Sequence, residues 1–287
     1  MSRVHKPHRW QWLWLIPAAL LVWWPLWFLF MGALMSQEEL RLTIGPALGL
    51  GTGYTVWHLL PDWPTLEPLL TLLLDTPQFF VMFWNSIGQS VAQVVGNLLV
   101  GAPAAWAISR LRFRGRSMVR GLYIVLMLLP FQVTMVPSYL VLRQFGLLDT
   151  PWAIILPGIF STFPVFIMER GFDTVPREVL ESASIDGANQ WQRFWRIGIP
   201  LGIPGLISAL TLGFLDAWNA IEQPMTFLES PQYWPLSLFF TDPANLDTKQ
   251  LGLAMAASLW MLLPSILAFR FGQTYLEAGL TKGAVKG

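Results

Sequence analysis

The chain has 287 residues, of which 54% are hydrophobic and 12% are charged, and its net charge is +1. A soluble domain carries about 25% charged residues, so this composition excludes an ordinary soluble domain and predicts a membrane protein. The charge balance gives no indication of a nucleic-acid partner, and the absence of cysteine excludes disulfides and thiolate metal sites.

Six apolar runs are each close to the roughly 20 residues that a helix needs to cross a bilayer. They predict an all-α membrane protein with six transmembrane helices. The first run follows a basic start and could be a cleavable signal, but it is long and no A-x-A-like site follows it, so we interpret it as a retained helix. The predicted spans are Trp12–Leu34, Met82–Ile108, Leu122–Leu142, Trp152–Phe172, Ile199–Ala220 and Leu251–Phe271.

The distribution of Lys and Arg predicts the orientation, because these residues accumulate in cytoplasmic loops. If the N-terminus is cytoplasmic, all but three of the 18 Lys and Arg residues lie on the inner side, and the exceptions are Arg41, Arg143 and Lys249. Both termini are therefore predicted to be cytoplasmic. The predicted organisation is an N-terminus at 1–11, a first span at 12–34, an external loop at 35–81, a membrane core at 82–272 with a cytoplasmic loop at 173–198, and a C-terminal tail at 273–287.

The first external loop is long and rich in glycine at its start, and Leu66–Leu74 could form a short helix along the membrane surface. On its length alone, the loop could contact an external binding protein or form a packed lid. Both possibilities stay open.

The second span carries a carboxamide side chain, from Asn or Gln, at every fourth position from Asn85 to Asn97. Steps of four drift by about 40° each, so this stripe winds around about a third of the helix. Because unpaired amides are costly in hydrocarbon, the stripe must face the bundle or a wet cavity. It either lines a path for a hydroxyl-rich solute or makes interhelical hydrogen bonds. The candidate path residues are Asn85, Gln89, Gln93, Asn97, Gln132, Thr134 and Asn219.

The third span contains Pro130 and Pro137. A proline inside a membrane helix leaves backbone carbonyls that neighbours or water must satisfy, so these residues indicate either a bend or a solute site. The fourth span ends in Glu169-Arg170, and adjacent residues do not share a helix face. We therefore expect these two side chains to be solvated and not paired with each other.

The fifth span ends in Asp216-Ala217-Trp218-Asn219. Asp216 lies near the predicted external interface, where it could cap a gate, contact solute or extend to water. Because deep burial of a carboxylate is costly in a membrane, we favour the water-facing carboxylate.

The most charged continuous stretch runs from Thr174 to Pro200, between two long apolar segments. Pro176 suits the first turn of a helix, and the acidic residues after it lie near the positive end of the helix dipole. Asp186-Gly187 interrupts this helix, because Gly tolerates positive φ and Asp can cap the next helix. Small residues surround the interruption, so another backbone or a bulky side chain could approach closely there.

Several motifs along the chain, including the stretch just described, resemble those of ABC-importer permease subunits. Residues 181–200, with Glu181-Ser182-Ala183 and Asp186-Gly187-Ala188, resemble the EAA loop of that family, although Ser182 stands where the family usually has Ala. The R-x-R-F-x-G-R turn at 110–116, Trp218-Asn219 and the C-terminal G-L-x-x-G-A-V-K-G are similar to the carbohydrate-uptake branch, in particular the maltose-type permease without a large external insert.

The resemblance implies a type I ABC importer permease fold in the cytoplasmic (inner) membrane. It implies that the loop is a coupling helix that docks on an ATPase, through Glu178, Glu181, Ser182, Ala183, Asp186, Gly187 and Ala188. It implies that the tail reaches the ATPase dimer through Gly279, Lys282, Gly283 and Lys286. The implied partners are a second permease subunit, an ATP-binding subunit dimer and an extracytoplasmic solute-binding protein, within the membrane lipid.

The expected function is import of a carbohydrate or related polar solute, without enzymatic activity in this chain and without a cofactor. The sequence contains no G-x-x-x-x-G-K-[ST] motif to bind ATP phosphates, and we expect no convergent metal-binding cluster. The alternative is an ion-coupled secondary transporter, which would need ionisable residues in the middle of its spans. No such residue is evident.

Overall fold

The computed structural model describes residues 9–48, 54–56, 58–241 and 251–284. Within them, all regular structure is helical. The chain divides into two compact units, Met1–Phe80 with Phe240–Leu262 (unit 1) and Val81–Phe239 with Leu263–Gly287 (unit 2).

Unit 1 contains the first long apolar helix and the external-loop helices. Its small core joins Met31, Met35 and Leu40, and Ser36 caps the second helix by accepting a hydrogen bond from Glu39 N–H (3.2 Å). The most apolar stretch of the first helix has no residue buried within the chain, which leaves it available to lipid. The elements are α1 (Arg9–Gly32), α2 (Gln37–Ile44), η1 (Gly45–Leu48), α3 (Glu67–Leu70) and η2 (Thr71–Asp75), with the start of α13 (Leu251–Ala284).

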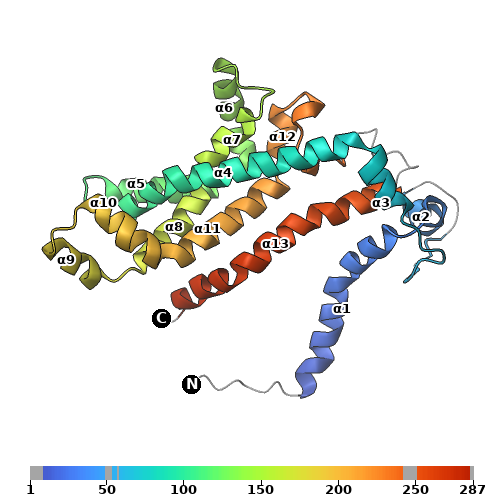
Figure 1. The fold of residues 1–287 in the computed structure, drawn as a ribbon, viewed down its shortest axis with the longest axis horizontal. Helices are drawn as coiled ribbons and strands as arrows, with labels where there is room; N and C mark the ends of the chain where they lie inside the picture. The colour runs from blue at the N-terminus through green and yellow to red at the C-terminus, as the bar shows by residue number, and fades with distance from the viewer. Residues whose placement is uncertain (1–8, 49–53, 57, 242–250, 285–287) are drawn as a thin grey trace. The chain divides into compact units, whose positions relative to one another are not determined.

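Unit 2 contains the remaining helices, and within it α8 and α11 run side by side (Figure 1). Its core is centred on Trp106, Phe172 and Phe194, whose ring centroids lie 5.3 to 6.1 Å apart. The elements are α4 (Pro77–Arg110), α5 (Arg116–Leu128), α6 (Phe131–Gln144), α7 (Trp152–Ile159), α8 (Thr162–Asp173), α9 (Arg177–Ile185), α10 (Gln190–Arg193), η3 (Phe194–Gly198), α11 (Ile199–Asn219), α12 (Glu222–Phe227), η4 (Pro231–Tyr233) and η5 (Leu236–Leu238).

In the part of the chain that the structure describes, five helical stretches are long and apolar enough to cross a membrane, and α5 with α6 adds a sixth if the two form one broken span. The predicted span Leu122–Leu142 covers this pair, whose two helices meet at an angle of 103°, so the prolines of this span mark a bend. The break lies at Leu129-Pro130, where Pro130 has an extended ψ of 150° and begins α6. Proline disfavours helical geometry in the residue before it and lacks a backbone N–H, so the bend follows from this residue. The last predicted span, Leu251–Phe271, lies within α13, which continues as a helix to Ala284.

Asp149 holds the turn between α6 and α7 against the segment after α12. Its Oδ2 accepts a hydrogen bond from Ser230 Oγ (2.5 Å), and its Oδ1 accepts from the backbone N–H groups of Ser230 (2.7 Å) and Glu229 (2.9 Å). These donors, the Ser230 hydroxyl above all, stabilise the ionised carboxylate and lower the pKa of Asp149 below its ordinary value.

This lowered pKa predicts acid-sensitive stability. A carboxyl whose pKa is depressed by folding stabilises the fold above its unfolded pKa of about 3.9, and this contribution is lost as the pH falls through the folded value. We expect Asp149→Asn to lower the melting temperature at neutral pH, and the gap from wild type to close as the pH falls below about 4. Asn, like Asp, tolerates the left-handed φ of +55° at this position, so the substitution should not add backbone strain. Scanning fluorimetry in detergent across a pH series measures the gap, and a gap that stays constant into acid would contradict the prediction.

Candidate transport cavity and coupling loop

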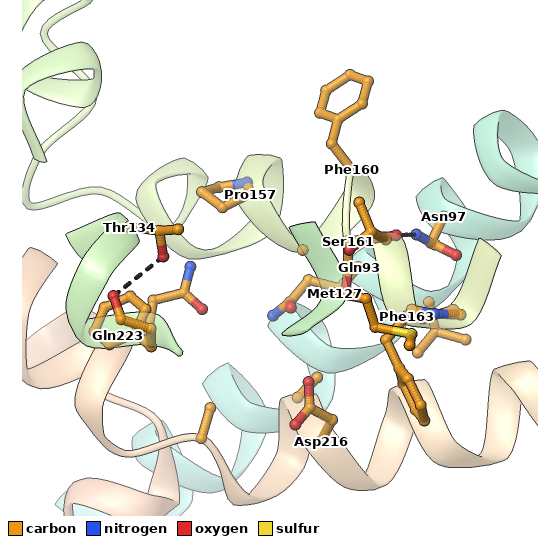
Figure 2. A pocket seen from close by; sticks show the side chains of 18 of the residues that line it. Gln93, Asn97, Met127, Thr134, Pro157, Phe160, Ser161, Phe163, Asp216 and Gln223 are labelled. Atoms are coloured by element: carbon orange, nitrogen blue, oxygen red, sulfur yellow. Dashed lines mark hydrogen bonds between the residues drawn. The ribbon is translucent and has the colours of Figure 1, made fainter. Parts of the chain in front are cut away.

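Unit 2 contains an open cavity of about 600 Å³ lined by residues of α4, α5, α6, α7, α8, α11 and α12 (Figure 2). Its polar lining comes from Gln93, Asn97, Thr134, Ser138, Ser161, Thr162, Asp216 and Gln223. Its apolar lining includes Phe131, Phe160, Phe163 and Phe227. Amides, hydroxyls and aromatic rings facing one space suit a polar organic solute better than an inorganic ion.

The polar stripe of α4 divides into two parts. Asn85 Nδ2 donates to the backbone oxygens of Gln232 (2.7 Å) and Trp234 (3.1 Å), and Gln89 Nε2 donates to that of Tyr233 (2.8 Å). These two amides bind the segment after α12 and do not line the cavity. Gln93 and Asn97 do line it.

Asn97 also joins α4 to the break between α7 and α8. Its Nδ2 donates to the carbonyls of Ile159 (2.9 Å), the last residue of α7, and of Ser161 (3.0 Å), the N-cap of α8. The Gln93 side chain packs directly against the backbone of Gly158, where an added Cβ would stand 2.0 Å from Gln93 Oε1. The absence of a side chain at Gly158 therefore leaves room for this amide beside the cavity.

The other predicted path residues separate in the same way. Thr134 lines the cavity and donates its hydroxyl hydrogen bond to Phe131 O (3.1 Å). Gln132 Nε2 instead donates to both carboxylate oxygens of Glu222 (2.9 and 2.7 Å). Asn219 Nδ2 donates to Leu215 O (2.7 Å), one turn earlier in its own helix, and lies outside the cavity lining.

Five polar lining residues were not among the predicted path residues, and they are Ser138, Ser161, Thr162, Asp216 and Gln223. Asp216 was expected to extend to water near the external interface, and the structure places it, exposed, in the wall of the cavity. Gln223 reaches the same cavity from α12 (Figure 2). A lone carboxylate in an apolar span was a usable signal for Asp216, whereas nothing in the local sequence marks Gln223.

The predicted coupling loop forms α9, a turn and α10, at one end of unit 2 (Figure 1). Gly187 has a φ of +81° and an added Cβ would meet no atom within 4 Å. Ala188 N–H donates to Ala183 O (2.9 Å), which closes the end of α9, and Asn189 and Gln192 form a capping box at the start of α10. Glu178, Glu181, Ser182, Asp186 and Gly187 are exposed, while Ala183 and Ala188 are partly buried.

The loop is exposed, and hydrogen bonds and buried residues attach it to the rest of unit 2 on both sides. Arg110 Nη2 donates to the backbone oxygens of Phe172 and Val175, each at 2.5 Å, and so caps the end of α8. Val175 and Phe194, before α9 and after α10, are buried. Arg110 was predicted as a positive-inside residue and as part of the R-x-R-F-x-G-R turn, and this contact with the end of α8 was not predicted.

A polar network lies behind this attachment. Glu169 in α8 is only 3% exposed and pairs with Arg120 of α5, whose Nε donates to Glu169 Oε1 (2.5 Å). Arg120 Nη2 also lies 3.6 Å from Asp173 Oδ2, and Ser109 Oγ donates to Asp173 Oδ1 (2.7 Å). The expectation of a solvated Glu169 was wrong, because the partner comes from another helix and not from the adjacent Arg170.

Comparison with known proteins decides the family. Residues 97–282 match the family described as "Binding-protein-dependent transport system inner membrane component". The chain belongs to this family. The permease is 33% identical over 234 residues to the inner membrane ABC transporter permease protein YcjP of Escherichia coli, covering 80% of this chain and 83% of YcjP. It is 32% identical over 218 residues to the diacetylchitobiose uptake system permease protein DasC of Streptomyces coelicolor, covering 74% and 78%.

A solved structure shares the fold of the permease. It is a bacterial ABC transporter involved in the import of the acidic polysaccharide alginate, with a TM-score of 0.75 and 24% identity, covering 92% of this chain and 94% of that one. The predicted ABC importer permease fold and multi-pass location in the cytoplasmic membrane are thereby confirmed. The permease is the membrane component of its importer, and ATP hydrolysis lies in separate subunits.

The buried ion pair of the permease gives a prediction. Removing one partner of a buried pair leaves the other charge uncompensated, which typically costs about 3–5 kcal/mol, whereas replacing both is often far less costly. We expect Arg120→Met to destabilise the permease by several kcal/mol and Arg120→Met/Glu169→Gln to recover most of that loss. Melting temperatures of the assembled transporter measure both variants. Equal stability of the single and double variants would show that the pair is not energetically coupled.

The predicted tail contacts lie partly outside the described residues. Gly279, Lys282 and Gly283 belong to α13, which continues as a helix to Ala284. Lys286 lies outside the described residues. The structure therefore places the described part of the tail on a helix, and its contact with an ATPase stays a prediction.

One cluster in unit 1 differs from expectation. Glu39, His58 and Asp62 offer ligand atoms that all lie within 4.8 Å of one another, although no convergent cluster was expected from the sequence. His58 Nδ1 lies 3.6 Å from Asp62 Oδ1, and Glu39 Oε1 accepts from Asp62 N–H (2.7 Å).

Proposed function

We propose that the permease is one of two membrane subunits of a heteromeric ABC importer that carries a carbohydrate. The observation that carries this proposal is the family match over residues 97–282, together with DasC, whose name assigns it to diacetylchitobiose uptake. The cavity supports it, since its amides, hydroxyls and phenylalanine rings suit the hydroxyls and apolar ring faces of a sugar.

We assign the solute path of this subunit to the cavity-lining residues Gln93, Asn97, Thr134, Ser161 and Gln223. Among the predicted path residues, Asn85, Gln89, Gln132 and Asn219 have a structural role in this proposal, because each donates a hydrogen bond within the protein and none lines the cavity. An ion-coupled secondary transporter has no support from the family assignment.

In this proposal the energy for transport comes from ATP hydrolysis in the partner subunits and reaches this subunit through α9. In this proposal the loop 173–198 and both termini are cytoplasmic, and closure of an ATPase dimer moves α9 and Gly187 as a lever. Glu178, Glu181 and Asp186 supply polar contacts, and the small Ser182, Ala183 and Ala188 allow close approach. The attachment through Arg110, Val175 and Phe194 would transmit this movement to α8 and α11. A second permease and an extracytoplasmic solute-binding protein complete the importer.

A single cysteine tests the orientation and the partner, because the natural chain has none. Ser184→Cys lies on the exposed side of α9. We expect it to resist membrane-impermeant thiol reagents in intact cells, to react after permeabilisation, and to cross-link to an ATP-binding subunit that co-purifies with a second permease. Labelling of Ser184→Cys from outside intact cells would refute the arrangement.

Uptake of radiolabelled diacetylchitobiose and other short oligosaccharides by cells that express the whole importer tests the solute class. Import of amino acids or peptides, and of no carbohydrate, would refute it.

A further inference from the structure

The cavity in unit 2 carries a negative charge that the cavity lining does not balance. Asp216 is the one ionisable side chain among the described residues that line it, and no Lys, Arg or His is among them. No described residue forms an ion pair or a hydrogen bond with its carboxylate. Figure 2 shows the carboxylate and the Gln93 amide pointing toward the same space from α11 and α4.

The arginines of unit 2 are committed elsewhere or lie outside the lining. Arg110 and Arg116 donate to backbone oxygens at the ends of α8 and α4, and Arg120 pairs with Glu169. Glu222, the neighbour of the lining residue Gln223, adds a second carboxylate. This carboxylate accepts a hydrogen bond from the neutral amide of Gln132. The charge near the cavity is therefore acidic.

We propose that this cavity selects against anionic sugars, and that Asp216 is the specificity-determining residue. The inference rests on the proposed carbohydrate function and names the chemical class of its solute, which is an uncharged or amino-bearing carbohydrate. A carboxylate accepts hydrogen bonds from sugar hydroxyls and attracts an ammonium group, whereas a uronic acid or sulfated sugar would place like charges together in the cavity. Like-charge juxtaposition of this kind is a common means of rejecting the wrong ligand.

Charged thiol reagents measure the potential inside the cavity directly, on the assembled importer in membranes. Ser161→Cys places a small thiol in the cavity wall of a chain that otherwise has no cysteine. Its reaction rates with a cationic trimethylammonium-ethyl and an anionic sulfonato-ethyl methanethiosulfonate are compared, each relative to a free thiol in solution. The fraction modified is read from the gel shift of this chain with maleimide-polyethylene glycol, so that partner cysteines do not interfere.

We expect the cationic reagent to be favoured by about three- to tenfold, and Asp216→Asn in the same background to remove most of that preference. The matched control is Ser184→Cys on α9, outside the cavity, where Asp216→Asn should leave the ratio unchanged. A ratio at Ser161→Cys that Asp216→Asn does not change, or a preference for the anionic reagent in the presence of Asp216, would overturn the inference.

Protection of Ser161→Cys from an uncharged methanethiosulfonate then tests the sugars themselves. A glucose trimer, a glucosamine trimer and a galacturonic acid trimer are compared at matched concentration. The first two should protect better than the third, and Asp216→Lys should reverse the order of the two charged trimers. Equal protection by all three would overturn the inference. If no sugar protects while the reagent ratio holds, it is the carbohydrate function that fails and not the charge of the cavity.

Discussion

Gly205→Val is expected to prevent stable folding of the permease. At Gly205 an added Cβ would stand 2.3 Å from Gly171 Cα, and the reciprocal distance from Gly171 is 2.6 Å. Both obstacles are backbone atoms, so the contact can be relieved only by separating α8 from α11. Close backbone approach at small residues is a general means of packing membrane helices, which gain little from the hydrophobic effect within lipid.

Separation of these helices would open the centre of unit 2. Phe172 lies against Gly202 on the neighbouring turn of α11, where an added Cβ would meet its ring at 2.8 Å, and Phe172 belongs to the buried aromatic cluster with Trp106 and Phe194. We expect Gly205→Val to cost at least about 3 kcal/mol and to abolish a monodisperse peak in fluorescence-detected size exclusion. Gly205→Ala should produce a smaller loss in melting temperature.

The matched control is Gly88→Ala in α4. Gly88 also lies inside a long membrane helix, but an added Cβ there would meet no atom within 4 Å. The Gly88→Ala variant should melt at or slightly above the wild-type temperature, because Ala has a higher helix propensity than Gly. Wild-type behaviour of Gly205→Val would show that α8 and α11 are not in backbone contact in the membrane.

Gly187→Asp is expected to abolish uptake while membrane insertion and assembly stay normal. The left-handed φ of +81° costs a residue with a side chain about 1–2 kcal/mol, and the added carboxylate enlarges the surface proposed to dock on the ATPase. The surrounding space is open, so the loss should not spread to the rest of the fold. Uptake, ATPase stimulation and the quantity of assembled importer are measured on the same membranes.

Gly146→Asp is the matched control for this variant. Gly146 also has a positive φ, of +67°, with open space around it, but it lies in the turn after α6, so the same substitution brings similar strain without touching α9. It should retain most of the uptake. Normal transport by Gly187→Asp, or equal loss in both variants, would remove Gly187 from the coupling role.

The sequence determined the features that depend on local chemistry. Runs of apolar residues predicted the spans, since the bilayer imposes a minimum length on each, and α9 with its interruption at Gly187 followed from Pro176, the acidic first turn and the need for positive φ. The motifs of the loop and tail resembled the family that the comparisons confirm.

Only the tertiary structure decided which side chains meet. The partner of Glu169 comes from α5, 49 residues earlier in the chain, and the same amide type serves as a hydrogen-bond donor to a loop at Gln89 and as cavity lining at Gln93. Prolines predicted an irregularity at Pro130 but not the 103° angle. Local pattern specifies the face of a helix, whereas partners, angles and cavities depend on how separate helices pack, and that information is spread over the whole chain.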